Sequence, residues 1–572
     1  MLLLEIGLVV LSLLTAFIYP ELGSRWFEKT ERSLSQLSRH RRVSVVAVGV
    51  IALTLRAALL PVLPIPQPAV HDEFSYLLMA DTFSHGRLTN PTHPMWIHFE
   101  SFHINQKPTY ASIYYPAQGI FLAIGQVFFR HPFWGVWLSS GLMCASICWM
   151  LQGWFPAYWA LLGGLLAVVR LGSFSYWVNS YWGGTVAALG GALVLGALPR
   201  IKRHQYLRDV VLMGLGFALL ANSRPYEGLF FSIPIIVALL DWMIRQRKPD
   251  FQKSLKRVVV PLAITLCATA AGMLYYFWRV TGSPFHTPYL INLATYNPVP
   301  FFPWAPIKPW PQYHHMVMQR FYSGWTLKMY WTARNYPLLS AIVKMEMFSF
   351  FFLGPLFMLP FVMLGFVLPR EFSFKDIARK TRFFLLIACV TIFAILLSVF
   401  ANPHYAAPLV CVIYALIVTA LQRIRHWRWR GKPTGLAIVR SVPTVAVVLL
   451  LFSAAAPALH IQNGTKPETR CFYCSELLSR AHIQAQLERL PGGQLALVHY
   501  SPKHSPMEGW VYNRADIDHS KVVWANDMGP QNQELIDYFK DRKVWLVEPD
   551  TSPARLSAYT VPPQESTADA AH

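Results

Sequence analysis

Two adjacent carboxylates, Asp72 and Glu73, stand just after the point where an apolar segment of the sequence ends. Removing such charges from water is costly unless they meet a cation, a metal or a substrate hydroxyl. On a helix that begins near Phe74, Asp72 and Tyr76 would share a face at i, i+4 spacing. The residues leave two interpretations open: a carboxylate pair that does chemistry, and an Asp that caps a helix.

Two other polar groups interrupt apolar segments later in the chain. Arg224 and Glu227 stand in one short hinge, and His404 and Tyr405 stand in another. A guanidinium near lipid headgroups is suited to binding phosphate, because its forked donors match two phosphate oxygens. The alternatives for Arg224 are an ion pair with Glu227 or extension to the membrane interface. The alternative for His404 and Tyr405 is an interfacial belt.

A third candidate charge, Arg56, lies inside an apolar segment. An ionisable residue at membrane depth is a functional candidate, and extension of its side chain toward the outer end of the segment is the alternative.

The polar loop around Asp72 is rich in histidine, which raises the question of a metal. These histidines lack the tight i, i+3 or i, i+4 spacing with a partner carboxylate that typifies a strong site. The cofactor is left open, with a divalent cation as one candidate. The groups concerned are His71, His85, His93, His98, His103, Glu100 and Lys107. Farther along, Cys471 and Cys474 form a C-x-x-C without a second one beside it, which favours a local disulfide or a thiol pair over zinc.

The elements that position these groups are membrane spans. Of the 572 residues 54% are hydrophobic and 14% are charged, whereas soluble proteins carry about 25% charged residues. The apolar residues form blocks of about 18–23 residues, enough to cross a bilayer core of roughly 30 Å as a helix. These blocks are Val43–Pro64, Val258–Trp278, Glu346–Leu368, Phe383–Phe400 and Ala437–His460. The chain is therefore predicted to be a polytopic membrane protein, with Met1–Pro20 as an uncleaved first span.

The net charge of +21 follows from short basic connectors between the spans. Lys and Arg resist translocation and mark cytoplasmic loops, so this distribution predicts orientation and gives no support to nucleic-acid binding. The connectors are Arg25–Arg42, Arg200–Arg208, Arg245–Arg257, Arg370–Arg382 and Arg423–Lys432.

The connectors predict about twelve spans and a mainly α fold. Residues 1–460 form the transmembrane domain, and its first outer loop, 65–132, contains Asp72. Within that loop Ala117–Phe129 is too short to span comfortably and is expected to lie along the outer surface. The segment Arg279–Lys344 is expected to be an outer segment with little regular structure.

Residues 461–572 differ in composition and are predicted to form a small extracytoplasmic α/β domain. Its expected strands are Gln494–Tyr500, Lys521–Trp524 and Lys543–Val547, with a helix at Gln533–Lys540.

Several short motifs carry a family resemblance. The run Asp72-Glu73-Phe74-Ser75-Tyr76 resembles the start of the first outer loop of GT-C membrane glycosyltransferases, in particular protein O-mannosyltransferases and lipid A aminoarabinose transferases. Lys107-Pro108-Thr109-Tyr110 is similar to the Lys-Pro-Pro segment before the second juxtamembrane helix of that family, and Tyr115-Pro116 follows it. The turn His404-Tyr405-x-x-Pro408 is similar to a late outer turn of the family.

The resemblance implies an inverting transfer of a sugar from a polyprenyl-phosphate-linked donor on the outer face. Asp72 would deprotonate the acceptor hydroxyl or help to organise a cation, and Glu73 would support it. Arg224 and Lys107 would hold the donor phosphate. The substrate contacts would come from Tyr76, Tyr110, Asn179, Glu227, His404 and Tyr405.

One position departs from the family pattern. Many members carry an acidic residue in the second outer turn, where this chain has Asn179, so a two-carboxylate or metal mechanism is put in doubt. The aromatic residues around it, Tyr176-Trp177 and Tyr181, would suit stacking on a sugar.

The expected partners are membrane lipids, the polyprenyl-phosphate sugar donor and a protein, lipid or polysaccharide acceptor, in a bacterial plasma (inner) membrane. Two other classes of function stay open: a transporter or flippase of lipid-linked sugars, which would favour broken helices at mid-membrane, and a non-catalytic envelope scaffold.

Overall fold

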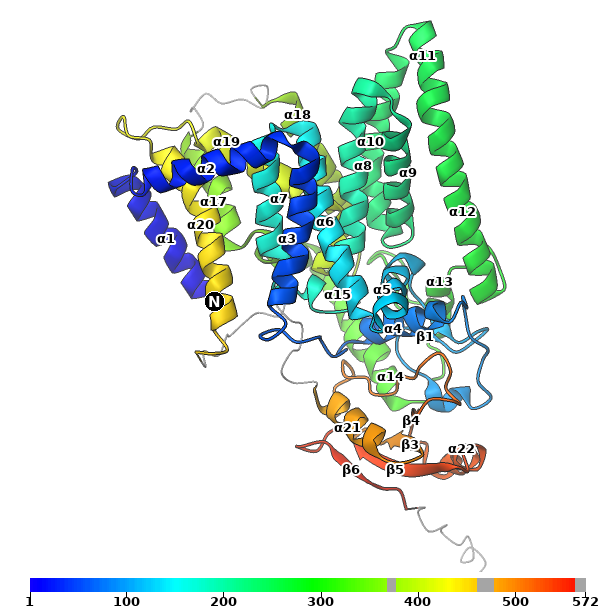
Figure 1. The fold of residues 1–572 in the computed structure, drawn as a ribbon. Helices are drawn as coiled ribbons and strands as arrows, with labels where there is room; N and C mark the ends of the chain where they lie inside the picture. The colour runs from blue at the N-terminus through cyan, green and yellow to red at the C-terminus, as the bar shows by residue number, and fades with distance from the viewer. Residues whose placement is uncertain (368–376, 460–477, 561–572) are drawn as a thin grey trace, which may run out of the picture.

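The structure is a computed structural model that describes residues 1–367, 377–459 and 478–560. It consists of a bundle of long helices and a smaller α/β unit beyond one end of the bundle (Figure 1). The fold class predicted from the sequence is confirmed. The Cys471–Cys474 pair, part of the connector Arg370–Arg382 and the predicted boundary at 460/461 lie outside the described residues.

Twelve helices within the described ranges correspond to the predicted spans. Seven of the helical segments are long and apolar enough to cross a membrane. Three more, α1, α7 and α9, have 15 to 17 residues, and α3 and α18 carry several basic residues at one end. The twelve are α1 (Leu2–Ile18), α3 (Arg41–Ala58), α6 (Phe133–Trp154), α7 (Ala157–Leu171), α8 (Thr185–His204), α9 (Leu207–Ala221), α10 (Pro225–Ile244), α12 (Val260–Thr281), α17 (Gly354–Val367), α18 (Arg379–Leu396), α19 (Val410–Ile424) and α20 (Thr434–Ala455).

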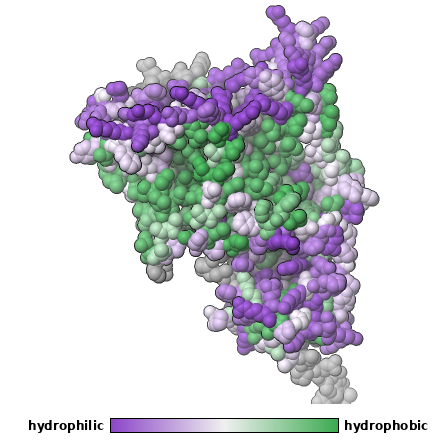
Figure 2. All heavy atoms as spheres, viewed as in Figure 1, coloured by the Kyte–Doolittle hydropathy of each residue, from purple (hydrophilic) through white to green (hydrophobic). Residues whose placement is uncertain are grey.

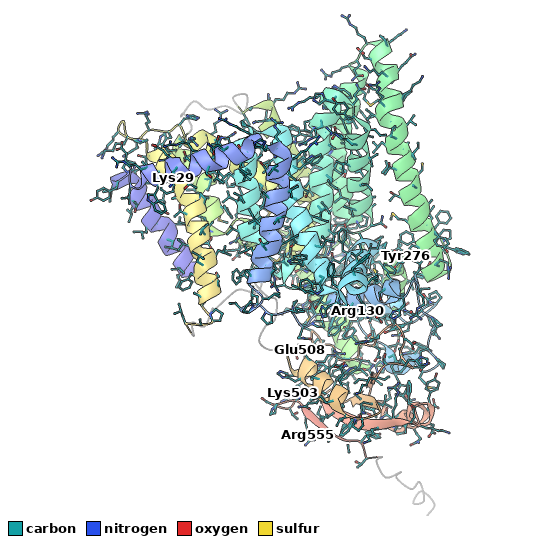
Figure 3. The ribbon with its side chains drawn as sticks, viewed as in Figure 1. Lys29, Arg130, Tyr276, Lys503, Glu508 and Arg555 are labelled. Carbon is teal, nitrogen blue, oxygen red and sulfur yellow. The ribbon has the colours of Figure 1, made fainter. Side chains whose placement is uncertain are left out.

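The two ends of the bundle differ in character. Figure 2 shows an apolar band between two hydrophilic regions, as expected of a chain that crosses a bilayer. At one end, the amphipathic helix α2 (Ser24–Arg39) lies across the bundle with Lys29 on it, and Lys503, Glu508 and Arg555 lie in the unit at the opposite end (Figure 3). We call the end with α2 the basic end and the opposite end the outer end.

Arg56 is a buried structural residue of α3. Its guanidinium donates to the carbonyl oxygens of Leu63 (3.0 Å) and Pro64 (3.5 Å), just after the helix ends. It also lies 4.9 Å from the ring centroid of Phe133. The side chain is fully buried, so Arg56 satisfies the backbone that leaves α3 instead of extending to the interface.

The first outer loop folds into two helices and a short hairpin. It contains α4 (His71–Ser84), a 3-10 turn at Trp96–Phe99, the antiparallel strands β1 (Ile104–Asn105) and β2 (Ala111–Ser112), and α5 (Pro116–Phe129). Helix α5 packs against both α4 and α6 at the outer end of the bundle (Figure 1). A Cβ atom on Gly135 would lie 1.9 Å from the carbonyl oxygen of Phe121, so the crossing of α5 over α6 requires glycine.

The segment Arg279–Lys344 is more regular than predicted. It contains α13 (Pro288–Thr295), α14 (Met316–Arg320), α15 (Leu327–Asn335) and most of α16 (Pro337–Phe348), and α16 leads through a π turn into α17. The dense Pro, Trp and Tyr residues hide a helical period in the sequence, because aromatic residues here occur at exposed positions, such as Trp331 and Tyr336, as well as at buried ones, such as Tyr330.

The C-terminal unit is a four-stranded sheet with two helices. The strand order is β4 (Val522–Asn526), β3 (Gly493–Val498), β5 (Arg542–Glu548) and β6 (Arg555–Ala558). Strand β3 is parallel to β4 and β5, and β6 is antiparallel to β5. The predicted strands and the helix α22 (Asn532–Tyr538) are present, whereas α21 (Leu478–Arg489) and the four-residue edge strand β6 were missed. Neither missed element has a strong apolar period.

Candidate active site

The start of α4 is fixed by the carboxylate of Glu73. One of its oxygens accepts hydrogen bonds from the backbone N–H groups of Ala69 (2.8 Å) and Val70 (3.1 Å). The other accepts from the N–H of Tyr181 (3.0 Å), which lies after the second outer turn. Glu73 is 3% exposed. The catalytic role expected for Glu73 is therefore replaced by a positioning role: its oxygens are occupied by backbone donors that join α4 to the helix bundle.

The carboxylate of Asp72 is the accessible one of the pair, with its side chain 23% exposed. One oxygen accepts a short hydrogen bond from the hydroxyl of Tyr114. The other lies 3.6 Å from Nδ1 of His103, and the Tyr114 hydroxyl also lies 3.1 Å from that nitrogen. Asp72, Tyr114 and His103 thus form one hydrogen-bonded group at the outer end of the bundle.

The neighbours of Asp72 determine its charge. Burial alone would raise the pKa of this carboxyl. The charge of His103 and the hydrogen bonds from His103 and Tyr114 outweigh burial and hold the pKa of Asp72 well below its usual range. Burial lowers the pKa of the adjacent His71 to about 3, so that ring is neutral and stacks on Phe102 at 4.1 Å. Asp72 is therefore a carboxylate at neutral pH.

Arg224 lies at the start of α10 and faces the same group. Its guanidinium carbon lies 4.3 Å from the ring centroid of Tyr405. Tyr405, Tyr76, Glu227 and Tyr114 are its electrostatic neighbours. The ring of Tyr76 in turn stacks on Tyr114 at 4.5 Å. Arg224 and Asp72 thus share Tyr76 and Tyr405 as electrostatic neighbours.

His404 lies in the 3-10 helix Pro403–Leu409 and connects the two charged groups. Its Nδ1 lies 2.9 Å from the hydroxyl of Tyr176, and its ring packs on Trp182 at 4.7 Å. It interacts electrostatically with both Arg224 and Asp72. The structure therefore brings together six of the residues singled out in the sequence: Asp72, Tyr76, Arg224, Glu227, His404 and Tyr405.

Three expected site residues lie elsewhere. Lys107 is exposed, with its Nζ 4.1 Å above the ring of Trp96, so it does not join Arg224 as a phosphate ligand. The hydroxyl of Tyr110 donates to the carbonyl of Asn513 (3.1 Å) in the C-terminal unit. The amide of Asn179 donates to the carbonyls of Ser173 and Ser175 and stabilises its own turn. The substrate-binding roles of Tyr110 and Asn179 stay predictions.

Four residues near Asp72 were not singled out as site residues. Tyr114 and His103 contact its carboxylate, and Tyr289 of α13 is an electrostatic neighbour of Arg224. Tyr512 comes from the C-terminal unit; its ring stacks on Phe74 at 4.1 Å, and the ring centroid of His71 lies 6.4 Å away. Tyr114 directly precedes the Tyr115-Pro116 pair, which was a usable signal. Nothing local in the sequence marks Tyr289 or Tyr512.

The divalent cation remains a prediction from the sequence. Within the described ranges no three His, Cys, Asp or Glu side chains are grouped so as to hold a metal. Both oxygens of Glu73 are taken by backbone donors, and His93 is directed to Asp518 at 2.9 Å.

No protein-family model matches the sequence, and no curated protein matches it. Among solved structures the chain is similar to ArnT from Cupriavidus metallidurans in the apo state, at 13% identity and a TM-score of 0.48 over 87% of this chain and 92% of that one. ArnT bound to undecaprenyl phosphate is 14% identical, with a TM-score of 0.46 over 91% of this chain and 95% of that one. The oligosaccharyltransferase AglB from Archaeoglobus fulgidus, in complex with an inhibitory peptide and a dolichol-phosphate, is 13% identical. Its TM-score is 0.44 over 88% of this chain and 69% of that one. Both proteins are of the GT-C class that the motifs resemble.

Proposed function

We propose that this chain is a membrane glycosyltransferase of a bacterial plasma membrane. It transfers a sugar from a polyprenyl-phosphate-linked donor to an acceptor on the extracytoplasmic side, where the C-terminal unit lies. The observation that carries the proposal is that a partly exposed carboxylate, Asp72, and the guanidinium of Arg224 both interact with His404 in one group of side chains at the outer end of the bundle.

Asp72 acts on the acceptor. In the free protein its carboxylate accepts a hydrogen bond from Tyr114; an acceptor hydroxyl takes the place of that donor. Removing the Tyr114 bond also raises the pKa of Asp72, which makes the carboxylate a better base. It then takes the hydroxyl proton while the acceptor oxygen attacks the anomeric carbon of the sugar.

Arg224 acts on the leaving group. As the bond between the anomeric carbon and the phosphate oxygen breaks, the electron pair stays on the polyprenyl phosphate. A forked guanidinium stabilises this charge on two oxygens. Its place above the Tyr405 ring keeps the donors oriented before the lipid binds. A single displacement of this kind inverts the anomeric centre.

Replacement of Asp72 tests the proposal. Asp72→Asn keeps the shape of the side chain and removes the base, so transfer should fall by roughly 10²–10⁴-fold. The measurement is transfer from a radiolabelled polyprenyl-phosphate sugar in membranes, with protein amount and monodispersity followed in parallel. Asp516→Asn, at an exposed carboxylate of the C-terminal unit, is the matched control and should keep full activity.

Equal activity in Asp72→Asn and Asp516→Asn would overturn the assignment. Movement of the lipid-linked sugar across vesicles without a covalent product would instead favour a flippase.

A further inference from the structure

A second site lies at the basic end of the bundle, far from Asp72 along the spans. There a cavity of about 500 Å³ opens between the first residues of α7, the start of α18 and the end of α19. Figure 1 shows α18, α19 and α2 at this same end. The cavity is lined by Trp159, Ala378, Lys380, Thr381, Thr419, Gln422, Arg423, Arg425 and His426.

The lining is strongly cationic. It contains Lys380, Arg423 and Arg425, and these described lining residues include no Asp or Glu. Lys380 and Arg423 lie close enough to repel each other. Holding like charges around one cavity costs free energy unless an anion offsets it.

Glu31, an acid in contact with the lining residue Arg425, is already engaged. The carboxylate of Glu31 in α2 forms a two-point ion pair with Arg440, at 2.9 and 3.2 Å, and lies 3.7 Å from Arg425. Glu31 therefore balances Arg440 and part of the charge of Arg425. Lys380 and Arg423 line the cavity together with Arg425.

The other lining groups suit a phosphate at the depth of lipid headgroups. Thr381 and Gln422 supply neutral hydrogen-bond donors beside the cations. Trp159 belongs to a residue type enriched at membrane interfaces, and Arg425 lies 5.8 Å from its ring. Lys380 similarly lies 4.2 Å from the ring of Phe155. Basic pockets between spans on the cytoplasmic side bind anionic headgroups.

We propose that this cavity binds the phosphate of an anionic phospholipid headgroup from the leaflet at the basic end. The site is separate from the proposed transfer site. Its cations come from two spans, α18 and α19, and from the residues that follow α19, so a bound phosphate would join these elements to each other.

The test compares two double variants with the same change in charge. Lys380→Gln/Arg423→Gln removes two cavity cations. Arg428→Gln/Arg430→Gln removes two exposed cations from the turn that follows α19, outside the cavity. Arg425 is kept in both variants because its contact with Glu31 supports α2. Both variants must elute as monodisperse protein with the wild-type unfolding temperature in phosphatidylcholine.

Binding is measured on the purified full chain by native mass spectrometry and by shifts in unfolding temperature. The probes are short-chain phosphatidylglycerol, phosphatidylcholine and inorganic phosphate. We expect phosphatidylglycerol to bind, phosphatidylcholine not to bind, and the Lys380→Gln/Arg423→Gln variant to bind about 30-fold more weakly, at about 1 kcal/mol for each cation. The Arg428→Gln/Arg430→Gln variant should bind as wild type does.

Two results would overturn the proposal: equal loss of binding in both variants, or no difference between phosphatidylglycerol and phosphatidylcholine. If inorganic phosphate stabilises the wild type as strongly as phosphatidylglycerol does, and the cavity variant loses both effects, the cavity is a phosphate site whose ligand is a soluble anion.

Discussion

Asp72 owes its properties to neighbours that are distant from it in the sequence. Tyr114 and His103 follow it by 42 and 31 positions and reach its two oxygens from the open end of the β1–β2 hairpin, where β1 begins and β2 ends. His404 and Arg224 belong to later hinges of the bundle. The low pKa of this carboxyl is therefore a property of the folded group of residues, and it should change when one neighbour is altered.

Tyr114→Phe tests this dependence. The hydroxyl of Tyr114 stabilises the charged form of Asp72, so its loss should move the pKa of Asp72 upward, toward the usual range. If the carboxylate is the active form, the acidic side of the pH–rate profile should then move to higher pH. The profile of kcat/KM against pH measures this shift.

Tyr110→Phe is the matched control for this profile, because its hydroxyl donates to a backbone carbonyl of the C-terminal unit and not to Asp72. Superimposable acidic limbs in Tyr114→Phe, Tyr110→Phe and wild type would show that Tyr114 does not set the charge of Asp72.

At the scale of single elements, α4 depends on one buried acid. Burial raises the pKa of Glu73 to about 7, from a usual value of 4.5. Between these values the folded chain holds a proton that the unfolded chain has lost, so stability falls as pH rises through this window. The loss amounts to at most about 3 kcal/mol.

Glu73→Gln should remove this pH dependence, because an amide does not titrate. The measurement is the apparent unfolding temperature in detergent between pH 4.5 and 7.5. The unfolding temperature of wild type should fall across this range. That of Glu73→Gln should be lower at pH 4.5, because the variant has lost a backbone acceptor, and should stay nearly constant as the pH rises. Glu534→Gln, on the exposed part of α22, should follow wild type; a variant at Glu73 that does the same would contradict the role given to it.

The sequence predicted elements better than it predicted the site. Long apolar blocks require helices whatever surrounds them, so the spans and the surface helix α5 could be placed from local pattern. Short helices such as α13 and α14 lack a clear period and were missed. Asp72, Arg224 and His404 could be grouped because span parity places their hinges at one end. The roles of Lys107 and Tyr110 could not be assigned, since they depend on where Trp96 and Asn513 lie in space.

At the scale of the whole molecule, two regions separated by most of the sequence form one structure. The C-terminal unit packs on the first outer loop through the stacking of Tyr512 on Phe74 and through Arg480, which lies 4.7 Å from the rings of Phe74 and Trp524. The backbone N–H of Ala515 donates to Asp81 of α4 (2.8 Å). The C-terminal unit therefore covers the start of α4 next to Asp72.

The orientation of the chain can be tested with single cysteines. In a variant with all seven native cysteines replaced by Ala, Lys503→Cys and Arg555→Cys lie on the outer unit and Lys29→Cys lies on α2 at the opposite end (Figure 3). If the basic end faces the cytoplasm, a membrane-impermeant maleimide added to intact cells should label the first two and not the third.

Permeabilised cells supply the control for this labelling, since all three cysteines should react there. Labelling of Lys29→Cys alone in intact cells would reverse the orientation and place the Asp72 group on the cytoplasmic side.

The stacking of Tyr512 on Phe74 also has a consequence for the synthesis of the protein. A ribosome makes α4 more than four hundred residues before it makes Tyr512, so during most of synthesis Phe74 and His71 lack the cover they have in the finished chain. A nascent or prematurely terminated chain can insert all its spans and still lack part of the surroundings of Asp72. Under the proposed function, activity would therefore appear only when translation is complete.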